Sequence, residues 1–325
     1  MVRIPVGEVT YTSPYIPAEW IEAHGLRARR MLPRLAANDG LDHLSGLCPY
    51  ARAFLGECNR SAGPFIFVTA CDQMRRLAEF AERPAFVFNM PSTCETTASL
   101  RLYVGELRRL SEFLIDLGGH SPSRDRLIEI MLDHDRIRRA LREARGAMAS
   151  PPYARALAGY FENGQAFVVP PSGGLKPVGV PLALIGSPVM ASHLDLFDTV
   201  EKAGGAIVLD ATASGERSLP GNLDRRDLTG HSDPLFALAG LYFEIPSAFR
   251  RPNAGLFRYL GAELKQRGVR GIVFRTCLWC DTWRAEAERI RHWPGLPMVE
   301  LDVADEPAPG GSALTRLQSF LEMLQ

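Results

Sequence analysis

Cysteine is the residue type in this sequence with the widest chemical range, because thiolates bind metals, carry redox changes and act as nucleophiles. The 325 residues include six cysteines: Cys48, Cys58, Cys71, Cys94, Cys277 and Cys280. Cys71 and Cys280 each begin the pattern C-D-x-x-R-x-x-A-E, just after an apolar run. Either this repeat reflects an internal duplication that delivers a thiol twice, or it is a chance match between two helix starts.

The spacing of the cysteines limits the sites they can form. Structural zinc takes four ligands, commonly from paired C-x-x-C segments, and only Cys277 and Cys280 have that spacing. The same pair is a weak match to a thioredoxin-like redox motif. Three thiolates from separate loops suit a [4Fe–4S] cluster with one open iron, which acts as a Lewis acid toward a substrate oxygen. Inert buried cysteine remains the alternative for any one of the six.

The composition argues against several other classes of protein. The 37 basic and 37 acidic residues cancel, so no large basic field attracts nucleic acid or an anionic membrane. No apolar run approaches the roughly 20 residues that span a bilayer, and the N-terminus lacks a secretory signal. We therefore expect a cytoplasmic protein, in which disulfides are disfavoured and metal or redox roles for cysteine gain weight.

Apolar runs alternate with amphipathic segments along the chain. The pattern predicts strands at residues 63–70, 84–90, 180–188, 206–212, 269–276 and 295–303. It predicts helices at 15–32, 48–58, 71–83, within 91–119, and at 124–150, 193–205, 257–268, 280–291 and 313–324. A Gly- and Pro-rich stretch at 168–181 marks a domain boundary, which gives domains 1–174 and 175–325. We predict an α/β protein of two doubly wound, Rossmann-like or flavodoxin-like parallel-sheet domains.

In doubly wound sheets ligands sit at the carboxyl ends of the strands. Cys71, Cys94, Cys277 and Cys280 all fall just after predicted strands, and helix N-termini there favour the thiolate. We therefore expect a thiolate site between the domains, an inter-domain iron–sulfur site. In the alternative, the Cys-Asp pairs serve only as helix caps.

Six segments, in order, carry a resemblance to the 2-hydroxyacyl-CoA dehydratase family, which includes benzoyl-CoA reductase subunits. "YTSPYIPAEWIEAHGLRARRML" resembles the family's N-terminal S-x-Y-x-P-x-E helix, and "LCPYARAFLGE" its first cysteine segment. "TACDQMRRLAEF" is similar to the second cysteine segment, with "FVFNMP" as the strand that follows. "VPLALIGSPV" with "VLDATASGER" resembles second-domain strands, and "RGIVFRTCLWCDTWRAEAERI" the third cysteine segment.

Carried over residue by residue, the resemblance implies that Cys48, Cys71 and Cys280 bind the cluster, with Cys277 and Cys94 as alternates. Cys280 is preferred to Cys277 because Trp283 and Glu286 follow it at the family's spacing of three and six residues. The resemblance also makes Ser13 a candidate catalytic hydrogen-bond donor to the thioester, against an ordinary turn residue before Pro14. Two further residues are expected to have no special role. Glu19 is expected to be an exposed acid in the first turn of a helix rather than a catalytic base. Arg217 is expected to be a solvated loop arginine, although it could bind a CoA phosphate.

The chemistry implied by the resemblance is a lyase reaction of anaerobic metabolism, the radical elimination of water from a 2-hydroxyacyl-CoA. A separate ATP-hydrolysing activator supplies one low-potential electron, and the thioester carbonyl becomes a ketyl radical that expels the hydroxyl. The chain itself has no G-x-x-x-x-G-K-[ST] loop, so ATP binding of that kind belongs to another polypeptide. The implied partners are an acyl-CoA, the activator, and a second dehydratase or reductase subunit or a second copy of the chain.

Three alternatives stay open. The six cysteines match the number needed for a double-cubane [8Fe–9S] cluster in a reductase, or the chain could be a benzoyl-CoA reductase-type subunit. It could instead be an electron-transfer or scaffold subunit without its own substrate. A cluster-free regulatory or zinc-binding protein is the remaining interpretation.

Overall fold

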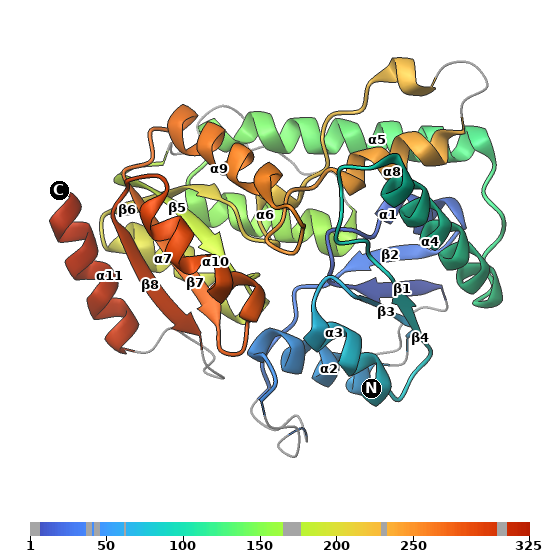
Figure 1. The fold of residues 1–325 in the computed structure, drawn as a ribbon, viewed down its shortest axis with the longest axis horizontal. Coiled ribbons are helices and arrows are strands. Elements are labelled where there is room, and N and C mark those ends of the chain that lie inside the picture. Colours follow the sequence, from blue (N-terminus) through green and yellow to red (C-terminus); the bar gives the residue numbers. More distant parts are fainter. Residues whose placement is uncertain are drawn as a thin grey trace.

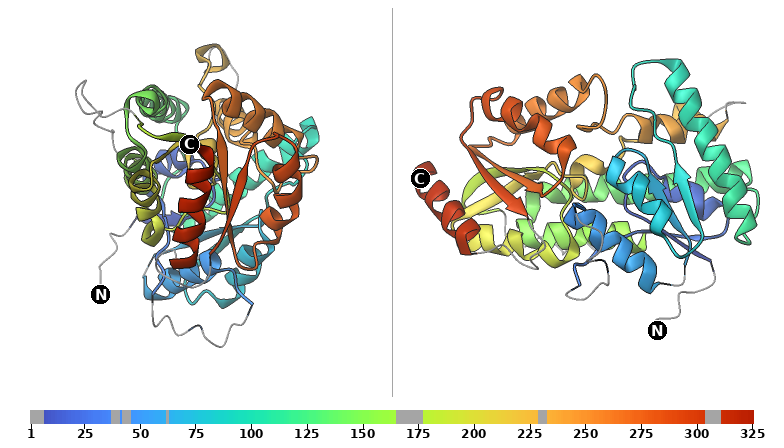
Figure 2. Two further views of the ribbon diagram at one scale, coloured as in Figure 1. Left: turned by 90° about the vertical axis from the view of Figure 1, so that its left-hand side faces the viewer. Right: turned by 60° about the horizontal axis from the view of Figure 1, so that its bottom comes forward.

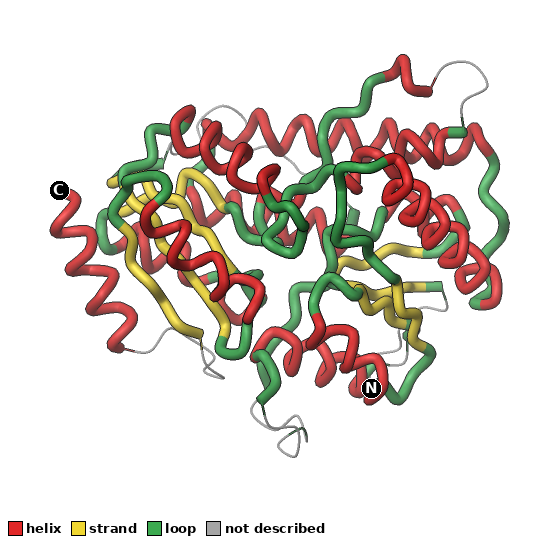
Figure 3. The backbone as a smooth tube through the Cα atoms, viewed as in Figure 1, coloured by secondary structure: helices red, strands yellow, loops and turns green. Residues whose placement is uncertain are grey.

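A computed structural model describes residues 7–36, 41, 46–61, 63–164, 177–228, 233–303 and 311–325. Two four-stranded parallel sheets lie side by side, each with helices on both faces (Figure 1). Figure 3 shows the two groups of strands as separate layers with helices between and around them. The predicted α/β class with two parallel sheets is therefore confirmed.

The first unit is built on β1 (Glu8–Tyr11), β2 (Arg27–Arg30), β3 (Phe65–Val68) and β4 (Ala85–Phe88), in the order β2-β1-β3-β4. One face is covered by α2 (Pro49–Arg60) and α3 (Asp72–Leu77), whose apolar side chains meet Phe65 and Phe67. The other face meets α1 (Ala18–Ala23) and α4 (Thr97–Asp116), with α5 (Arg124–Ala144) packed outside them. Both α4 and α5 start at hydroxyl N-caps, Thr96 and Ser123, as such helices commonly do.

The second unit repeats this order. Its strands are β5 (Val180–Gly186), β6 (Gly205–Asp210), β7 (Gly271–Cys277) and β8 (Met298–Val303), arranged β6-β5-β7-β8. Helices α7 (Asp195–Lys202) and α11 (Gly311–Leu324) cover one face, and α9 (Ala254–Gln266) and α10 (Asp281–His292) the other (Figure 2). In both sheets, then, the first and third strands of the unit are the central pair.

Two helices cross between the units. Helix α6 (Ser150–Asn163) contacts β2 of the first unit and α7 and β6 of the second. Helix α8 (Pro234–Phe243) follows β6 in sequence but packs its Leu235, Leu238 and Tyr242 into the core of the first unit, against α4 and α5. Short 3-10 turns complete the described elements, at Ala78–Phe80, Arg145–Ala147, Ala191–His193, Glu216–Ser218 and Arg225–Leu228.

The structure corrects the predicted helix at 15–32. Only Ala18–Ala23 is helical, because Gly25 turns the chain at a φ of +80° and Arg27–Arg30 then pairs with β1 as a strand. Strands β1 and β2 and helices α6 and α8 have no counterpart in the sequence prediction. The predicted domain boundary at 174/175 lies within residues 165–176, outside the described residues. None of the described helices is long and apolar enough to cross a bilayer.

Candidate functional site

A pocket of about 140 Å³ lies at the carboxyl ends of the four central strands, where the two units face each other. Each of these strands is followed by a residue that lines it: Ser13 after β1, Cys71 after β3, Ser187 after β5 and Cys280 after β7. Cys48, at the start of α2, completes the set of three thiols. The facing ends of α2, α3 and α10 can be followed in Figure 1. The position agrees with the rule that parallel sheets bind ligands at their carboxyl ends.

The three thiols occupy the same position in three helices. Cys48, Cys71 and Cys280 are the N-cap residues of α2, α3 and α10. Backbone N–H groups of the first turn act on each sulfur and favour the thiolate, Ala51 for Cys48, for example, and Trp283 for Cys280. The repeated C-D-x-x-R pattern therefore has one structural meaning, a thiol at the corner between a central strand and a helix.

Without a cation in the pocket, burial opposes ionisation of these thiols. Burial is the largest effect on Cys71 and raises its pKa, although the N–H groups of Met74 and Gln73 oppose it. Burial likewise raises the pKa of Cys280 to about 11, against the Ser187 hydroxyl and the Trp283 N–H. Cys71 and Cys280 are close enough for each thiolate to repel the other. Three partly desolvated thiols around one pocket are groups that a bound cationic centre would ionise.

Cys277 lies behind this group rather than in it. It ends β7, is fully buried, and is not among the residues that line the pocket. A hydrogen bond with Cys48 is the main cause that lowers the pKa of Cys277 to about 6, with help from Arg275 and Ser187. The same hydrogen bond raises the pKa of Cys48 well above its usual value. Cys277 is thus the more acidic thiol of a buried pair, while Cys280 faces the pocket.

The other two cysteines lie apart from the pocket. Cys58 is fully buried in α2, and burial raises its pKa. Cys94 lines a separate cavity of about 410 Å³ near Arg250 and Glu244. The structure therefore brings Cys48, Cys71 and Cys280 together, with Cys277 beside Cys48, and does not bring Cys58 or Cys94 to them.

Ser13 lies at the pocket in a tight turn. Its Oγ accepts a hydrogen bond from the backbone N–H of Tyr15, 3.3 Å away, and Ser13 and Pro14 both line the cavity. The hydroxyl proton is not used by this bond. Ser13 is therefore a turn residue, and its hydroxyl proton is also available to donate to an occupant of the pocket.

Glu19 was expected to be exposed, and the structure contradicts this. Its side chain is fully buried, forms an ion pair with Arg138 and accepts a hydrogen bond of 2.6 Å from the Tyr242 hydroxyl. Burial raises the pKa of Glu19, but Arg138, His134 and Tyr242 outweigh it and bring the pKa to about 2. Glu19 is a structural acid that ties α1 to α5 and α8.

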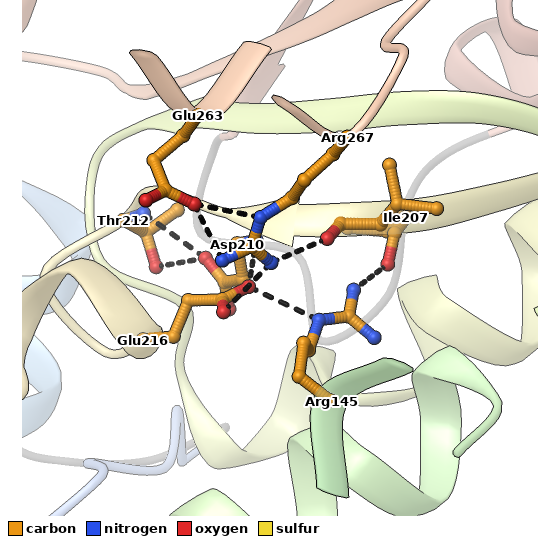
Figure 4. A network of polar contacts seen from close by, with 8 residues as sticks. Arg145, Ile207, Asp210, Thr212, Glu216, Glu263 and Arg267 are labelled. Atoms are coloured by element: carbon orange, nitrogen blue, oxygen red, sulfur yellow. Dashed lines mark hydrogen bonds and ion pairs between the residues drawn. The ribbon is translucent and has the colours of Figure 1, made fainter. Parts of the chain in front are cut away.

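Arg217 is not a solvated loop arginine. It is buried in the 3-10 turn Glu216–Ser218, and its guanidinium donates to the carbonyls of Ala211 and Pro246. The group lies 5.5 Å from the centre of the Trp283 ring, and Trp283 lines the pocket. The preceding residue, Glu216, is clamped between Arg145 and Arg267 and accepts from the Asp210 N–H at 3.0 Å (Figure 4). The polar loop after β6 is therefore folded into the interior.

Ser187 is the site residue that sequence reasoning missed. It is buried, its Oγ accepts from the Cys277 N–H at 3.0 Å, and its hydroxyl acts on the sulfurs of both Cys277 and Cys280. Gly186 places it there: at a φ of +130°, a Cβ on this residue would lie 1.9 Å from the Arg275 carbonyl. The available signal was the Gly-Ser-Pro sequence at the end of a buried strand.

The chemistry of this set of ligands suits a cluster better than a single ion. In the described part of the chain, no three His, Cys, Asp or Glu side chains are close enough to hold one metal ion. The ligands of a cubane lie farther apart, because each thiolate binds a different iron. The three thiols lie on separate helix starts around one pocket, where each would bind a different iron of a cubane and leave the fourth iron open.

Taken together, the fold and the pocket define a two-unit α/β protein with a thiol-lined site between its parallel sheets. The family model for "2-hydroxyglutaryl-CoA dehydratase, D-component" matches residues 14–324. The chain belongs to this family, as the resemblance of its cysteine segments predicted. The Escherichia coli (strain K12) protein "Putative dehydratase subunit YjiM" is 22% identical over 324 residues, which cover 86% of this chain and 80% of that protein.

Proposed function

We propose that the chain is the iron–sulfur subunit of a radical 2-hydroxyacyl-CoA dehydratase, a cytoplasmic hydro-lyase. The observation that carries the proposal is the convergence of Cys48, Cys71 and Cys280 on one pocket between the two units. Family membership supports it, because the family model is named for a dehydratase component. A bound [4Fe–4S] cluster would supply a low-potential electron and one open iron as a Lewis acid.

The residues of the pocket would hold and orient the reacting thioester. Tyr15, Met74, Phe249 and Trp283 give the pocket apolar walls, which exclude water from a radical intermediate. The free hydroxyl proton of Ser13 can donate to the thioester oxygen. The Ser187 hydroxyl supports the Cys280 sulfur from the other side. The protein would thus contribute orientation and dryness, while the electron comes from outside the chain.

The electron source in this proposal is a separate ATP-hydrolysing activator, and a second subunit or a second copy of the chain completes the enzyme. The name of the matched family, a D-component, supports a multi-component enzyme. The acyl-CoA enters the pocket where the two sheets face each other.

A second candidate is an electron-transfer subunit, because Cys277 supplies a fourth thiol next to the pocket. Cys277 is hydrogen-bonded to Cys48 and carries the lowered pKa of the pair. If Cys277 also bound iron, the cluster would be closed by four thiolates and would transfer electrons without binding substrate. The two candidates therefore differ in the role of one sulfur.

Iron and sulfide analysis after anaerobic reconstitution tests the proposal. About four irons per chain are expected for one cubane, and about eight for a double cubane. Cys71→Ser and Cys280→Ser should each lose the bound iron, whereas Cys58→Ser, a buried cysteine off the site, should keep it. Cys277→Ser should also keep the iron and should leave acyl-CoA binding intact.

Two results would contradict the proposal in different ways. Iron retained in both Cys71→Ser and Cys280→Ser removes the ligand assignment. Iron lost in Cys277→Ser, together with no acyl-CoA binding by the loaded wild type, favours the closed electron-transfer cluster. A wild type that takes up no iron under reconstitution leaves the family fold without the proposed chemistry.

A further inference from the structure

Four buried arginines surround the pocket. Arg30, Arg217, Arg250 and Arg275 are only 2–6% exposed, and each touches a residue that lines it. They come from four different segments: the end of β2, the loop after β6, the loop before α9 and the end of β7. Such a group is unusual, because a buried cation is costly unless something of opposite charge lies near it.

Arg30 and Arg217 hold the loops on either side of the pocket. The guanidinium of Arg30 donates to the carbonyl of Thr12 at 3.3 Å and to that of Ala213, and both residues line the cavity. Arg217 donates to the carbonyls of Ala211 and Pro246 and stacks near the Trp283 ring. The two cations repel each other, and burial lowers the pKa of both.

Arg250 and Arg275 repeat the arrangement from the other elements. Arg250 lies 4.8 Å from the centre of the Tyr15 ring and donates to the carbonyls of Pro91 and Phe243, while its buried Nε has no hydrogen-bond partner. Arg275 donates to the carbonyl of Pro188 at 2.9 Å and contacts His193. Both Tyr15 and Pro188 line the pocket.

Backbone carbonyls, the Ser218 hydroxyl and the His193 ring accept the hydrogen bonds of these arginines, but such dipoles do not cancel the charge. Within the described residues, none of the four forms an ion pair with a carboxylate, although Asp210 acts on Arg217 from a longer distance and Arg275 favours the thiolate of Cys277. Other buried arginines do have such partners: Arg138 pairs with Glu19, and Arg145 with Glu216. The buried arginines without a carboxylate partner within ion-pair distance are therefore concentrated around the pocket.

We propose that these four arginines, the arginine shell, carry the counter-charge for an anionic occupant of the pocket. This proposal rests on the proposed function. The anionic occupants are the thiolate-bound cluster and then the thioester, once it has gained one electron. That electron, supplied by the activator, converts the carbonyl C=O to a C–O group with one negative charge, and the unpaired electron stays on carbon. The shell acts through its field, because most of its N–H donors already bind backbone carbonyls, the Ser218 hydroxyl or the His193 ring.

The test measures the electrostatic potential at the pocket thiols in the full chain without a cluster. Iodoacetate and iodoacetamide both alkylate a thiolate with loss of iodide, but only iodoacetate is anionic, so the ratio of the two rates reports the local potential. Mass spectrometry gives the rates at Cys71 and Cys280, which are both partly exposed. We expect the wild-type ratio to exceed that of an unstructured cysteine peptide, and Arg30→Met and Arg217→Met each to lower it about threefold.

Matched variants separate charge from structure. Arg145→Met removes a buried arginine that binds Glu216 and Ile207, neither of which lines the pocket, so it should change the ratio much less than the two pocket variants. Arg217→Lys keeps the charge but loses the forked hydrogen bonds, so it should keep most of the ratio. A Lys variant that falls as far as the Met variant would overturn the proposal, as would a wild-type ratio equal to that of the peptide.

The alkylation ratio and the iron content can fail independently of each other. A chain that takes up no iron but shows the raised ratio contradicts the proposed function and supports the positive potential of the pocket. A chain that binds four irons but shows no dependence on Arg30 or Arg217 does the reverse.

Discussion

The Ser187 hydroxyl hydrogen-bonds to the sulfurs of both Cys277 and Cys280 and lowers the pKa of each. It accepts from the Cys277 N–H, so its own proton is left for a thiolate of Cys277 or Cys280. Hydrogen bonds to ligand sulfurs stabilise the more negative, reduced state of an iron–sulfur cluster. Under the proposed function, Ser187 is therefore a residue that tunes the potential of the cluster without binding iron.

Replacement of this hydroxyl gives a prediction at the scale of one residue. Ser187→Ala should bind the same amount of iron as wild type, with a midpoint potential more negative by about 40 mV, which corresponds to about 1 kcal/mol. An EPR-monitored redox titration measures the shift. Ser187→Cys, which keeps a weak donor, should lie between the two. An unchanged potential in Ser187→Ala would leave the residue with a packing role only.

At this scale the sequence could predict which residue types matter but not their surroundings. Cys71 and Cys280 stood out because each follows an apolar run and begins a helix-like segment, and the family resemblance added Cys48 to them. Glu19 and Arg217 were misjudged, since an acid in a first helical turn and an arginine in a polar loop look solvated. Their burial depends on α5, α8 and the loop before α9, which pack onto them from distant parts of the chain.

At the scale of the element, β6 ends in Asp210, an acid whose pKa is shifted by burial. Asp210 accepts from the N–H and hydroxyl of Thr212 at 3.0 and 2.7 Å, and it lies beside Glu216 (Figure 4). Burial is the main cause that raises the pKa of Asp210 from 3.8 to about 6, in spite of the Thr212 hydrogen bonds. Thr212 in turn is within 3.0 Å of Ser214, which accepts from the Val189 N–H next to the pocket.

This shift predicts a dependence of stability on pH. Between pH 4 and 6 folded Asp210 holds a proton that the unfolded chain has lost, so the free energy of unfolding falls as pH rises through this window. Asp210→Asn should remove that part of the slope, worth on the order of 2–3 kcal/mol. Urea unfolding of both proteins at pH 4.5 and 7 gives the difference. Parallel pH profiles for the two proteins would show that Asp210 titrates normally in the fold.

Long apolar strands were the elements that the sequence predicted best. Strands β3 to β8 each coincide with a predicted run. Strands β3, β5, β6 and β7 are buried on both faces and almost wholly apolar, whereas β4 and β8 are half-buried on one face. Strand β2, with the sequence Arg-Ala-Arg-Arg, carries no such signal; its arginines pair with Glu8 and the pocket loops instead. Helix α8 was not predicted, for a different reason. Its apolar residues lie among the strands of the second unit in sequence but pack on the first unit, so their partners are not visible from neighbouring residues.

At the scale of the whole molecule, the two units have the same strand order, and each delivers a thiol after its third strand. This equivalence supports the interpretation of the repeated cysteine pattern as an internal duplication. The pocket arises only where the two units meet, since neither sheet alone carries all three thiols. What sequence patterns could not supply is the way the units are joined: α8 returns to the first core, and α6 lies against both.

This joining predicts how the chain behaves when it is divided. A cut between residues 174 and 175, the boundary expected from composition, would leave α8 on the wrong fragment. Residues 1–174 would then expose the apolar residues of α4 that α8 covers, and residues 175–325 would expose Leu235, Leu238 and Tyr242. Each fragment made alone should be insoluble or bind a hydrophobic dye, because apolar patches of this kind drive aggregation.

The two fragments produced together should associate and recover solubility, which copurification through a tag on one of them measures. As a matched control, Leu238→Glu should prevent the association, whereas a change at Phe236, which is 39% exposed on the same helix, should not. Fragments that each fold alone and unfold cooperatively would contradict the prediction and would show that α8 adds little to the first core.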